Sequence, residues 1–174
     1  MDVLNDDHQA TAEIVLTHLG SVDTVVLNAG RSQRQLALHT DLQTTRDIME
    51  LNFFAYVSLA KVAAKFANQI VVTSSISGKL GTPGGSSYSA SKFALQGYFD
   101  ALRMENDVNV LLVCPGPVVS DIGKNAHGST ELDYVDKMPT ERCTFLLAVA
   151  MYWRFDEVWI SKQPELLYTV IAQY

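Results

Sequence analysis

Short apolar runs alternate along this chain with longer segments of helical periodicity, and this alternation limits the possible folds more than any other feature. The runs at 22–28, 70–74, 108–114 and 158–161 have the length and content of buried strands. The segments between them carry apolar residues at spacings of three and four. A strand, a helix and a second strand in the same direction build a parallel sheet covered by helices. The chain is therefore expected to be α/β.

Helices are expected between and after these strands. Their approximate ranges are 6–19, 40–66, 87–104, 141–153 and a last segment after Pro164. Thr40 and Gln43 have the spacing of a capping box, which predicts that the long second helix begins at Thr40. Residues 1–4 have the content of the end of another strand. A length of 174 residues suits one domain over residues 1–174, with a polar stretch at about 120–139.

Composition and charge exclude several classes of partner. The net charge is -6 and the pI is near 5.1, so no excess of Lys and Arg is available for a nucleic-acid backbone. The longest apolar stretch, 145–153, is too short to span a bilayer, and the acidic first residues do not predict a signal peptide. The chain as given is expected to be soluble. The four histidines lack metal-ligand spacing, so no metal site is expected.

Two polar side chains lie on apolar helical stripes. Asn52 lies on the buried face of the helix 40–66, where an amide must find hydrogen-bond partners. One interpretation is a structural strut to loose backbone groups. Lys92 lies on the apolar face of the helix 87–104, one turn after Tyr88. The plain alternative for this pair is a tyrosine that packs over the lysine stem.

Carbonyl reduction gives the pair a chemical interpretation. The reaction needs a proton donor at the oxygen, and a tyrosine hydroxyl has a pKa of about 10. A lysine cation within about 4–6 Å favours the phenolate. A second hydroxyl can hold the substrate oxygen, and Ser75 lies just beyond the strand 70–74. Ligands of open α/β sheets bind outside such strand ends. The plain alternative for the Gly, Pro and Asn residues at these strand ends is that they only form turns.

The same residues, taken in order, resemble the short-chain dehydrogenase/reductase family. The matching motifs are Asn28-Ala29-Gly30, Asn52, Ser75, Tyr88-Ser-Ala-Ser-Lys92 and Pro115-Gly116-Pro117-Val118. The resemblance implies a catalytic tetrad in which Tyr88 is the proton donor or acceptor and Ser75 orients the substrate oxygen. It implies that Lys92 lowers the tyrosine pKa and binds the nicotinamide ribose. It implies that Asn52 holds a water in a proton relay.

The resemblance also implies a nicotinamide cofactor, NADP or NAD, with NADP slightly favoured. The implied cofactor contacts, besides Tyr88 and Lys92, are Asp2, Val3, Asn28, Ala29, Gly30, Pro115, Gly116, Val118 and Ser120. The segments 142–143, 157–161 and 163–164 resemble one branch of the family. Relatives in that branch associate with the endoplasmic reticulum through a segment that these residues lack, so the location stays open.

The chain departs from the family at its beginning. The Thr-Gly-x-x-x-Gly-x-Gly turn that receives the pyrophosphate is missing from the sequence. A partial, doubly wound Rossmann-like sheet that lacks its first strands is therefore expected, with the strand 22–28 as an exposed apolar edge. The interpretation favoured here is that these residues are part of an intact enzyme. The alternative is a truncated product that has the catalytic residues but lacks the cofactor-binding turn. These residues alone are expected to bind dinucleotide poorly.

These residues are relevant to three classes of function. The leading one is an NAD(P)-dependent oxidoreductase for a small carbonyl or alcohol substrate, steroid- or retinoid-like, with residues 120–139 as a substrate lid. The alternative is a catalytically silent chain that acts through protein–protein contacts or as a homodimer. A serine hydrolase is disfavoured, because Ser75 lacks a Gly-x-Ser-x-Gly elbow. Cys114 and Cys143 are expected to be thiols rather than a disulfide.

Overall fold

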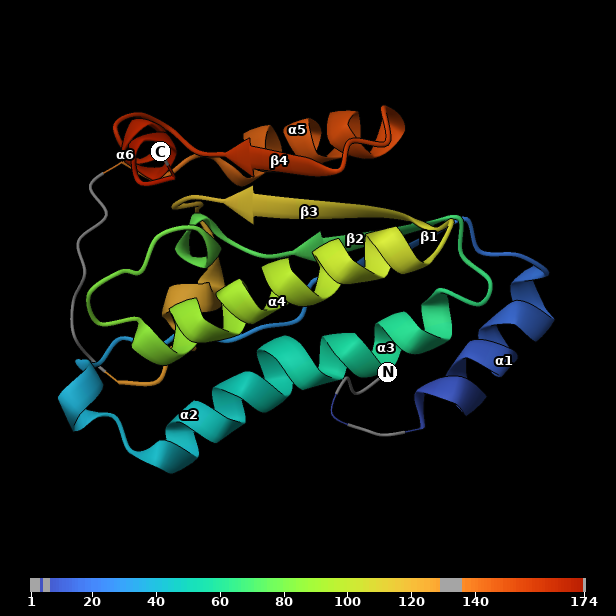
Figure 1. Cartoon of the computed structure of the whole chain (residues 1–174), viewed down its shortest axis with the longest axis horizontal. Coiled ribbons are helices and arrows are strands. Elements are labelled where there is room, and N and C mark those ends of the chain that lie inside the picture. Colours follow the sequence, from blue (N-terminus) through green and yellow to red (C-terminus); the bar gives the residue numbers. More distant parts are fainter. Residues whose placement is uncertain (1–3, 5–6, 129–135, 174) are drawn as a thin grey trace.

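A parallel sheet forms the centre of the computed structural model, which describes residue 4, residues 7–128 and residues 136–173 (Figure 1). Its strands are β1 (Thr24–Leu27), β2 (Gln69–Thr73), β3 (Asn109–Pro115) and β4 (Glu157–Ile160), paired in that order. In the register of the sheet, Val26 lies beside Val71, and Val71 beside Leu111. The predicted α/β class and the four expected strands are confirmed.

The central strands are buried on both faces, as their continuous apolar sequences require. Ile70 and Val71 of β2 and Leu111 of β3 are fully buried. In contrast, Val26 of β1 is 46% exposed, and within the described residues β1 pairs with β2 alone. The prediction of an exposed apolar edge at this strand is confirmed.

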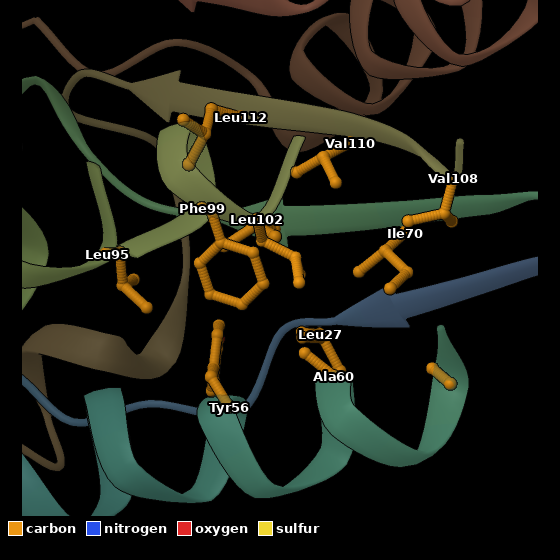
Figure 2. Close-up of a cluster of buried hydrophobic side chains, with 12 residues drawn as sticks. Leu27, Tyr56, Ala60, Ile70, Leu95, Phe99, Leu102, Val108, Val110 and Leu112 are labelled. Atoms are coloured by element: carbon orange, nitrogen blue, oxygen red, sulfur yellow. The ribbon is translucent and has the colours of Figure 1, made fainter. Parts of the chain in front are cut away.

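Helices cover both faces of the sheet. Their bounds are α1 (His8–Leu19), α2 (Leu42–Met49), α3 (Ala55–Ala63), α4 (Ser86–Glu105), α5 (Thr140–Tyr152) and α6 (Glu165–Ile171). On one face, Tyr56 of α3 and Phe99 of α4 pack with Leu27 and Val110 of the sheet (Figure 2). A second cluster joins α5 to the opposite face. No helix within the described ranges is long and apolar enough to cross a membrane.

The long helix predicted for 40–66 is confirmed as one continuous helical segment over 42–63 (Figure 1), but it is not a regular α-helix throughout. A five-residue π-helix, η2 (Glu50–Phe54), separates α2 from α3, and it contains the fully buried Asn52. Single π turns inside α-helices occur often at functional sites. Here the π turn contains a residue with a tertiary contact: the side-chain amide of Asn52 forms hydrogen bonds with the backbone of Arg31, in the loop after β1.

The capping box predicted at Thr40 and Gln43 is wrong. The N-cap of α2 is Asp41, whose carboxylate accepts a hydrogen bond from the Thr44 amide at 2.6 Å. This bond holds the pKa of the Asp41 carboxyl below its usual value. The Thr40 hydroxyl instead donates to the Leu36 carbonyl at 3.0 Å. Both residues are good N-caps, and the geometry of the preceding loop selects the second.

Candidate active site

One cleft of about 480 Å³ lies at the carboxyl ends of the strands. It is lined by residues that directly follow β1, β2 and β3, which is where open α/β sheets bind ligands. The predicted site residues that line this cleft are Asn28, Gly30, Ser75, Tyr88, Lys92, Pro115, Gly116, Val118 and Ser120. The structure therefore brings together most of the residues that the sequence singled out.

Lys92 is held between the sheet and its own helix. Its side chain is almost fully buried, and Nζ donates a hydrogen bond to the carbonyl oxygen of Thr73 at 2.8 Å. The same nitrogen lies 5.7 Å from the ring centre of Tyr88 and 5.5 Å from that of Tyr56. Burial lowers the pKa of Lys92 to about 8, while Cys114 has the smaller, opposite effect.

Ser75 faces the cleft from the end of β2. Its backbone is extended, and it is the N-cap of the short 3-10 helix η3 (Ile76–Gly78). The hydroxyl accepts a hydrogen bond from the Ser77 amide at 3.1 Å and donates one to the Pro115 carbonyl at 3.3 Å. Among the described residues, neither of these two hydrogen-bond partners of the Ser75 hydroxyl is an imidazole, the partner that a serine hydrolase would need. The donated bond is long and weak, so a substrate oxygen can compete for this hydroxyl.

The Asn52 side chain forms hydrogen bonds with both the backbone amide and the backbone carbonyl of Arg31. Its Oδ1 accepts from the Arg31 amide and its Nδ2 donates to the Arg31 carbonyl, each at 2.9 Å. Nδ2 also donates to Ser91 Oγ at 3.1 Å. These contacts are the ones expected if Asn52 has a structural role, in which its amide satisfies the backbone groups of a loop. Asn52 is not among the residues that line the cleft, and its implied place in a water relay stays a prediction.

The loop after β1 is held close to Asn52 and Lys92. A Cβ on Gly30 would lie 3.2 Å from Asn52 Oδ1, which is tight, and 3.8 Å from Lys92 Nζ, which is an ordinary contact. The Ala29 carbonyl accepts a hydrogen bond from the Tyr56 hydroxyl at 2.7 Å. Ala29 does not itself line the cleft. Burial, and to a lesser extent Tyr88, raises the pKa of Tyr56, which keeps this phenol protonated and donating.

Sequence reasoning missed Gln33, which caps the helix that carries Tyr88. Its Oε1 accepts hydrogen bonds from the amides of Ser87 at 2.7 Å and Tyr88 at 3.4 Å. The N-cap residue Gly85 has no side chain to do this. The side chain is nearly fully buried. The only sequence signal is a polar residue in a loop, so nothing marked Gln33 as a cap.

Several predictions lie partly or wholly outside the described residues. Asp2 and Val3, the implied adenine contacts, are among them. The predicted lid at 120–139 is described except for 129–135, and it contains the short helix η4 (Asp121–Gly123). On either side of that gap, Val118 pairs with Met138 and His127 with Gln33. The described parts of this segment thus lie against the cleft walls, and its role as a lid stays a prediction.

Cys114 and Cys143 are both free thiols, as expected. Burial raises the pKa of Cys114 to about 11, which makes this thiol a poor nucleophile. Burial also raises the pKa of Cys143, which lines the cleft. Among the described residues, no group of His, Cys, Asp and Glu is arranged to hold a metal ion.

Comparisons with known proteins agree with this geometry. The sequence profile of the family described as "short chain dehydrogenase" matches residues 1–130. Dehydrogenase/reductase SDR family member 7 of Mus musculus is 39% identical over 96% of this chain and 54% of that protein. The human member 7 is 38% identical over the same shares. The chain thus spans about half the length of these curated relatives, and they form the branch that residues 142–143 and 157–161 indicated.

Solved structures share the fold. A short chain dehydrogenase/reductase from Burkholderia phymatum, in complex with NAD, aligns with a TM-score of 0.83 and 21% identity over 98% of this chain and 72% of that chain. A short chain dehydrogenase from Burkholderia cenocepacia, in complex with NADP, aligns with a TM-score of 0.80 and 22% identity over 99% and 72%. At these identities the likeness shows a Rossmann-like fold. Together with the profile match, it establishes that the chain belongs to the short-chain dehydrogenase/reductase family.

Proposed function

We propose that this chain carries the catalytic centre of an NAD(P)-dependent oxidoreductase that interconverts a carbonyl group and a secondary alcohol. The observation that carries the proposal is that Ser75, Tyr88 and Lys92 line a single cleft at the strand ends. Membership of the family supports it, and so do the structural neighbours whose complexes contain NAD or NADP.

In the proposed reduction, Tyr88 gives its hydroxyl proton to the carbonyl oxygen while a hydride arrives at the carbon. The Lys92 ammonium, 5.7 Å from the Tyr88 ring, favours the phenolate that remains. Because the pKa of Lys92 is about 8, this side chain is mostly charged at neutral pH. In alcohol oxidation the same phenolate takes the proton back. Proton transfer by a positioned group contributes about 10²–10⁴-fold in rate.

Ser75 is proposed to hold the substrate oxygen. Its hydroxyl is anchored by the Ser77 amide, which leaves the proton free to move from the weak Pro115 bond to a substrate oxygen. A donor fixed in this way stabilises developing negative charge without having to reorganise. Ser75 and Tyr88 would then approach the same oxygen from β2 and α4.

The residues around the cleft fit the nicotinamide end of the cofactor. Asn28 and Gly30 after β1, and 115–118 after β3, bound the cleft beside Lys92. Gly30 and Gly116 let the side chains of Asn52 and Ser161 pack closely against these two loops. A bound nicotinamide supplies or accepts the hydride, and Lys92 would hold its ribose. The choice between NAD and NADP rests on residues outside this cleft.

A second candidate function rests on a different surface. The open edge of β1 exposes Val26, and α1 exposes Ile14 and Leu19 at 60% and 68%. An unpaired strand edge with apolar side chains is a template for pairing with another chain. A catalytically silent chain that binds a partner or a second copy through this edge is the alternative to the enzyme.

The experiment that separates the two candidates compares Tyr88→Phe with Tyr98→Phe. Both tyrosines lie on α4, but Tyr98 packs with Phe53 and Phe99 away from the cleft. Oxidation of NADPH and of NADH is followed with a panel of ketones, aldehydes and steroids. Tyr88→Phe is expected to lower turnover by at least about 100-fold, and Tyr98→Phe to leave it within about twofold. Equal turnover in both variants contradicts the proposal. Because residues 1–174 alone are expected to bind dinucleotide poorly, absence of turnover in the wild-type chain favours the contact function only where calorimetry shows that NADPH is bound.

A further inference from the structure

We propose that Arg34 binds an anionic group, a carboxylate by preference, on the substrate of this cleft. The inference rests on the proposed function and narrows its substrate class to carbonyl compounds or alcohols that carry a negative charge. Arg34 lines the same cleft as Ser75 and Tyr88. It was not among the residues that the sequence singled out, and neither the proton donor nor the cofactor contacts require it.

The backbone around Arg34 is fixed beside the helix that carries Tyr88. The Arg34 amide donates to the His127 carbonyl at 2.6 Å, and the next amide, that of Gln35, donates to the Gly84 carbonyl at 2.9 Å. The preceding residue, Gln33, caps the first turn of α4. Arg34 is therefore held between the start of α4 and the described part of the lid.

Two glycines allow the lid segment to lie against Arg34. A Cβ on Gly123 would come within 2.6 Å of Arg34 Nη2, and a Cβ on Gly128 within 2.6 Å of the Arg34 carbonyl oxygen. Gly128 also has a φ of 83°, which disfavours other residues. The guanidinium thus lies against the backbone of η4, in a wall of the cleft, and it is only partly exposed.

The Arg34 guanidinium has no ion-pair or hydrogen-bond partner among the described residues. The acidic residue of the cleft lining, Asp121, is exposed and is paired with Lys124 at 2.6 Å. An arginine stays charged at any physiological pH, so a partly buried guanidinium without an anion bears an uncompensated desolvation cost. A ligand carboxylate would offset that cost through two parallel hydrogen bonds.

The charge of the described part of the cleft lining differs in sign from that of the chain. The described residues that line it include three cationic side chains, Arg34, Lys92 and Lys137, against the single carboxylate of Asp121. The whole chain has a net charge of -6. A positive cleft in a negative protein concentrates anions at that site and repels them elsewhere.

A phosphate of the cofactor is the other source of such an anion. The residues that fit the nicotinamide end follow β1 and β3 directly, whereas Arg34 is bonded to the segment before α4 and to the lid. This placement puts Arg34 on the side of Tyr88 that the substrate would occupy. The substrate carboxylate is therefore the occupant that the contacts favour.

Calorimetric titration of the whole chain with a matched pair of probes, 4-acetylbenzoate and 4-acetylbenzamide, tests the inference without turnover. The wild-type chain is expected to bind the carboxylate at least about tenfold more tightly than the amide, as one charge-assisted contact predicts. Arg34→Gln is expected to abolish the preference, and Arg34→Lys to keep part of it. Arg46→Gln, an exposed arginine of α2, is the matched control and should keep all of it.

The outcomes also separate this inference from the proposed function. A carboxylate preference that survives Arg34→Gln, or no preference in the wild-type chain whether or not the probes bind, overturns the inference. A fall in NADPH affinity in Arg34→Gln with unchanged probe binding assigns the arginine to a cofactor phosphate instead. If Arg34 sets the preference while Tyr88→Phe leaves turnover intact, the anion site stands and the proposed chemistry fails.

Discussion

The side-chain nitrogen of Lys92 lies 5.7 Å from the centre of the Tyr88 ring, one helical turn away on α4. Its hydrogen bond to the Thr73 carbonyl ties that nitrogen to the end of β2. The sheet and the helix therefore fix the pair jointly, rather than the helix alone. Any change that shifts α4 along β2 would strain the bond that positions the Lys92 nitrogen.

The burial of Lys92 predicts a pH dependence of stability. Its pKa is about 8 in the folded chain, against 10.5 for an ordinary lysine. Below pH 8 both states carry the proton, so the cost of burying the charge is constant. Between about pH 8 and 10.5 the unfolded chain binds more protons, so this group makes the free energy of unfolding rise with pH, by at most about 1.4 kcal/mol per unit.

Lys92→Met removes this dependence. Urea denaturation measures the unfolding free energy of the wild-type chain and of Lys92→Met. Between pH 7.5 and pH 10, the value for the wild type is expected to rise relative to that of the variant. Lys61→Met on α3, an exposed lysine, provides the control. A difference that stays constant across this range would show that Lys92 titrates at its ordinary pKa.

The strut between Asn52 and Arg31 predicts a large loss of stability on substitution. Asn52→Leu leaves the Arg31 amide and carbonyl without these partners, at about 1–3 kcal/mol for each group that stays buried. We expect the unfolding free energy to fall by about 2–5 kcal/mol in denaturant titrations. Asn125→Leu, at an exposed position, should change it by less than about 0.5 kcal/mol. Equal effects at both positions would argue against the strut.

The close approach of Gly116 to Ser161 predicts a rescue. A Cβ on Gly116 would lie 2.6 Å from Ser161 Cβ and even closer to its hydroxyl, so Gly116→Ala is expected to cost about 1–3 kcal/mol. Ser161→Gly removes both clashing atoms. The double variant should therefore unfold at nearly the same temperature as Ser161→Gly alone. If the two losses in melting temperature simply add, the predicted contact is absent.

The parts of the fold that could be predicted from sequence are those that local pattern determines. The buried strands β2 and β3 are continuous apolar runs, and Tyr88 and Lys92 share a face through simple helical spacing. Their meeting with Ser75 follows from parallel strands that end at one edge of the sheet. None of these features needs a contact that the sequence hides.

The parts that could not be predicted depend on tertiary contacts. The π turn at Asn52 coincides with its bonds to Arg31, 21 residues away, which no helical periodicity reports. In the sequence Gln33 and Arg34 resemble ordinary loop residues, because their contacts with α4 and with His127 form only in the folded chain. The choice of Asp41 over Thr40 as N-cap depends in the same way on the path of the preceding loop.

The most direct test of the site is a double-mutant cycle between Ser75→Ala and Tyr88→Phe, measured as kcat/KM for carbonyl reduction at saturating cofactor. Two hydroxyls that act on one oxygen work as a unit, so losses of this kind are strongly non-additive. We expect the double variant to retain the residual activity of the poorer single variant, to within about threefold. Losses that multiply would show that Ser75 and Tyr88 act independently, and would contradict a shared catalytic site.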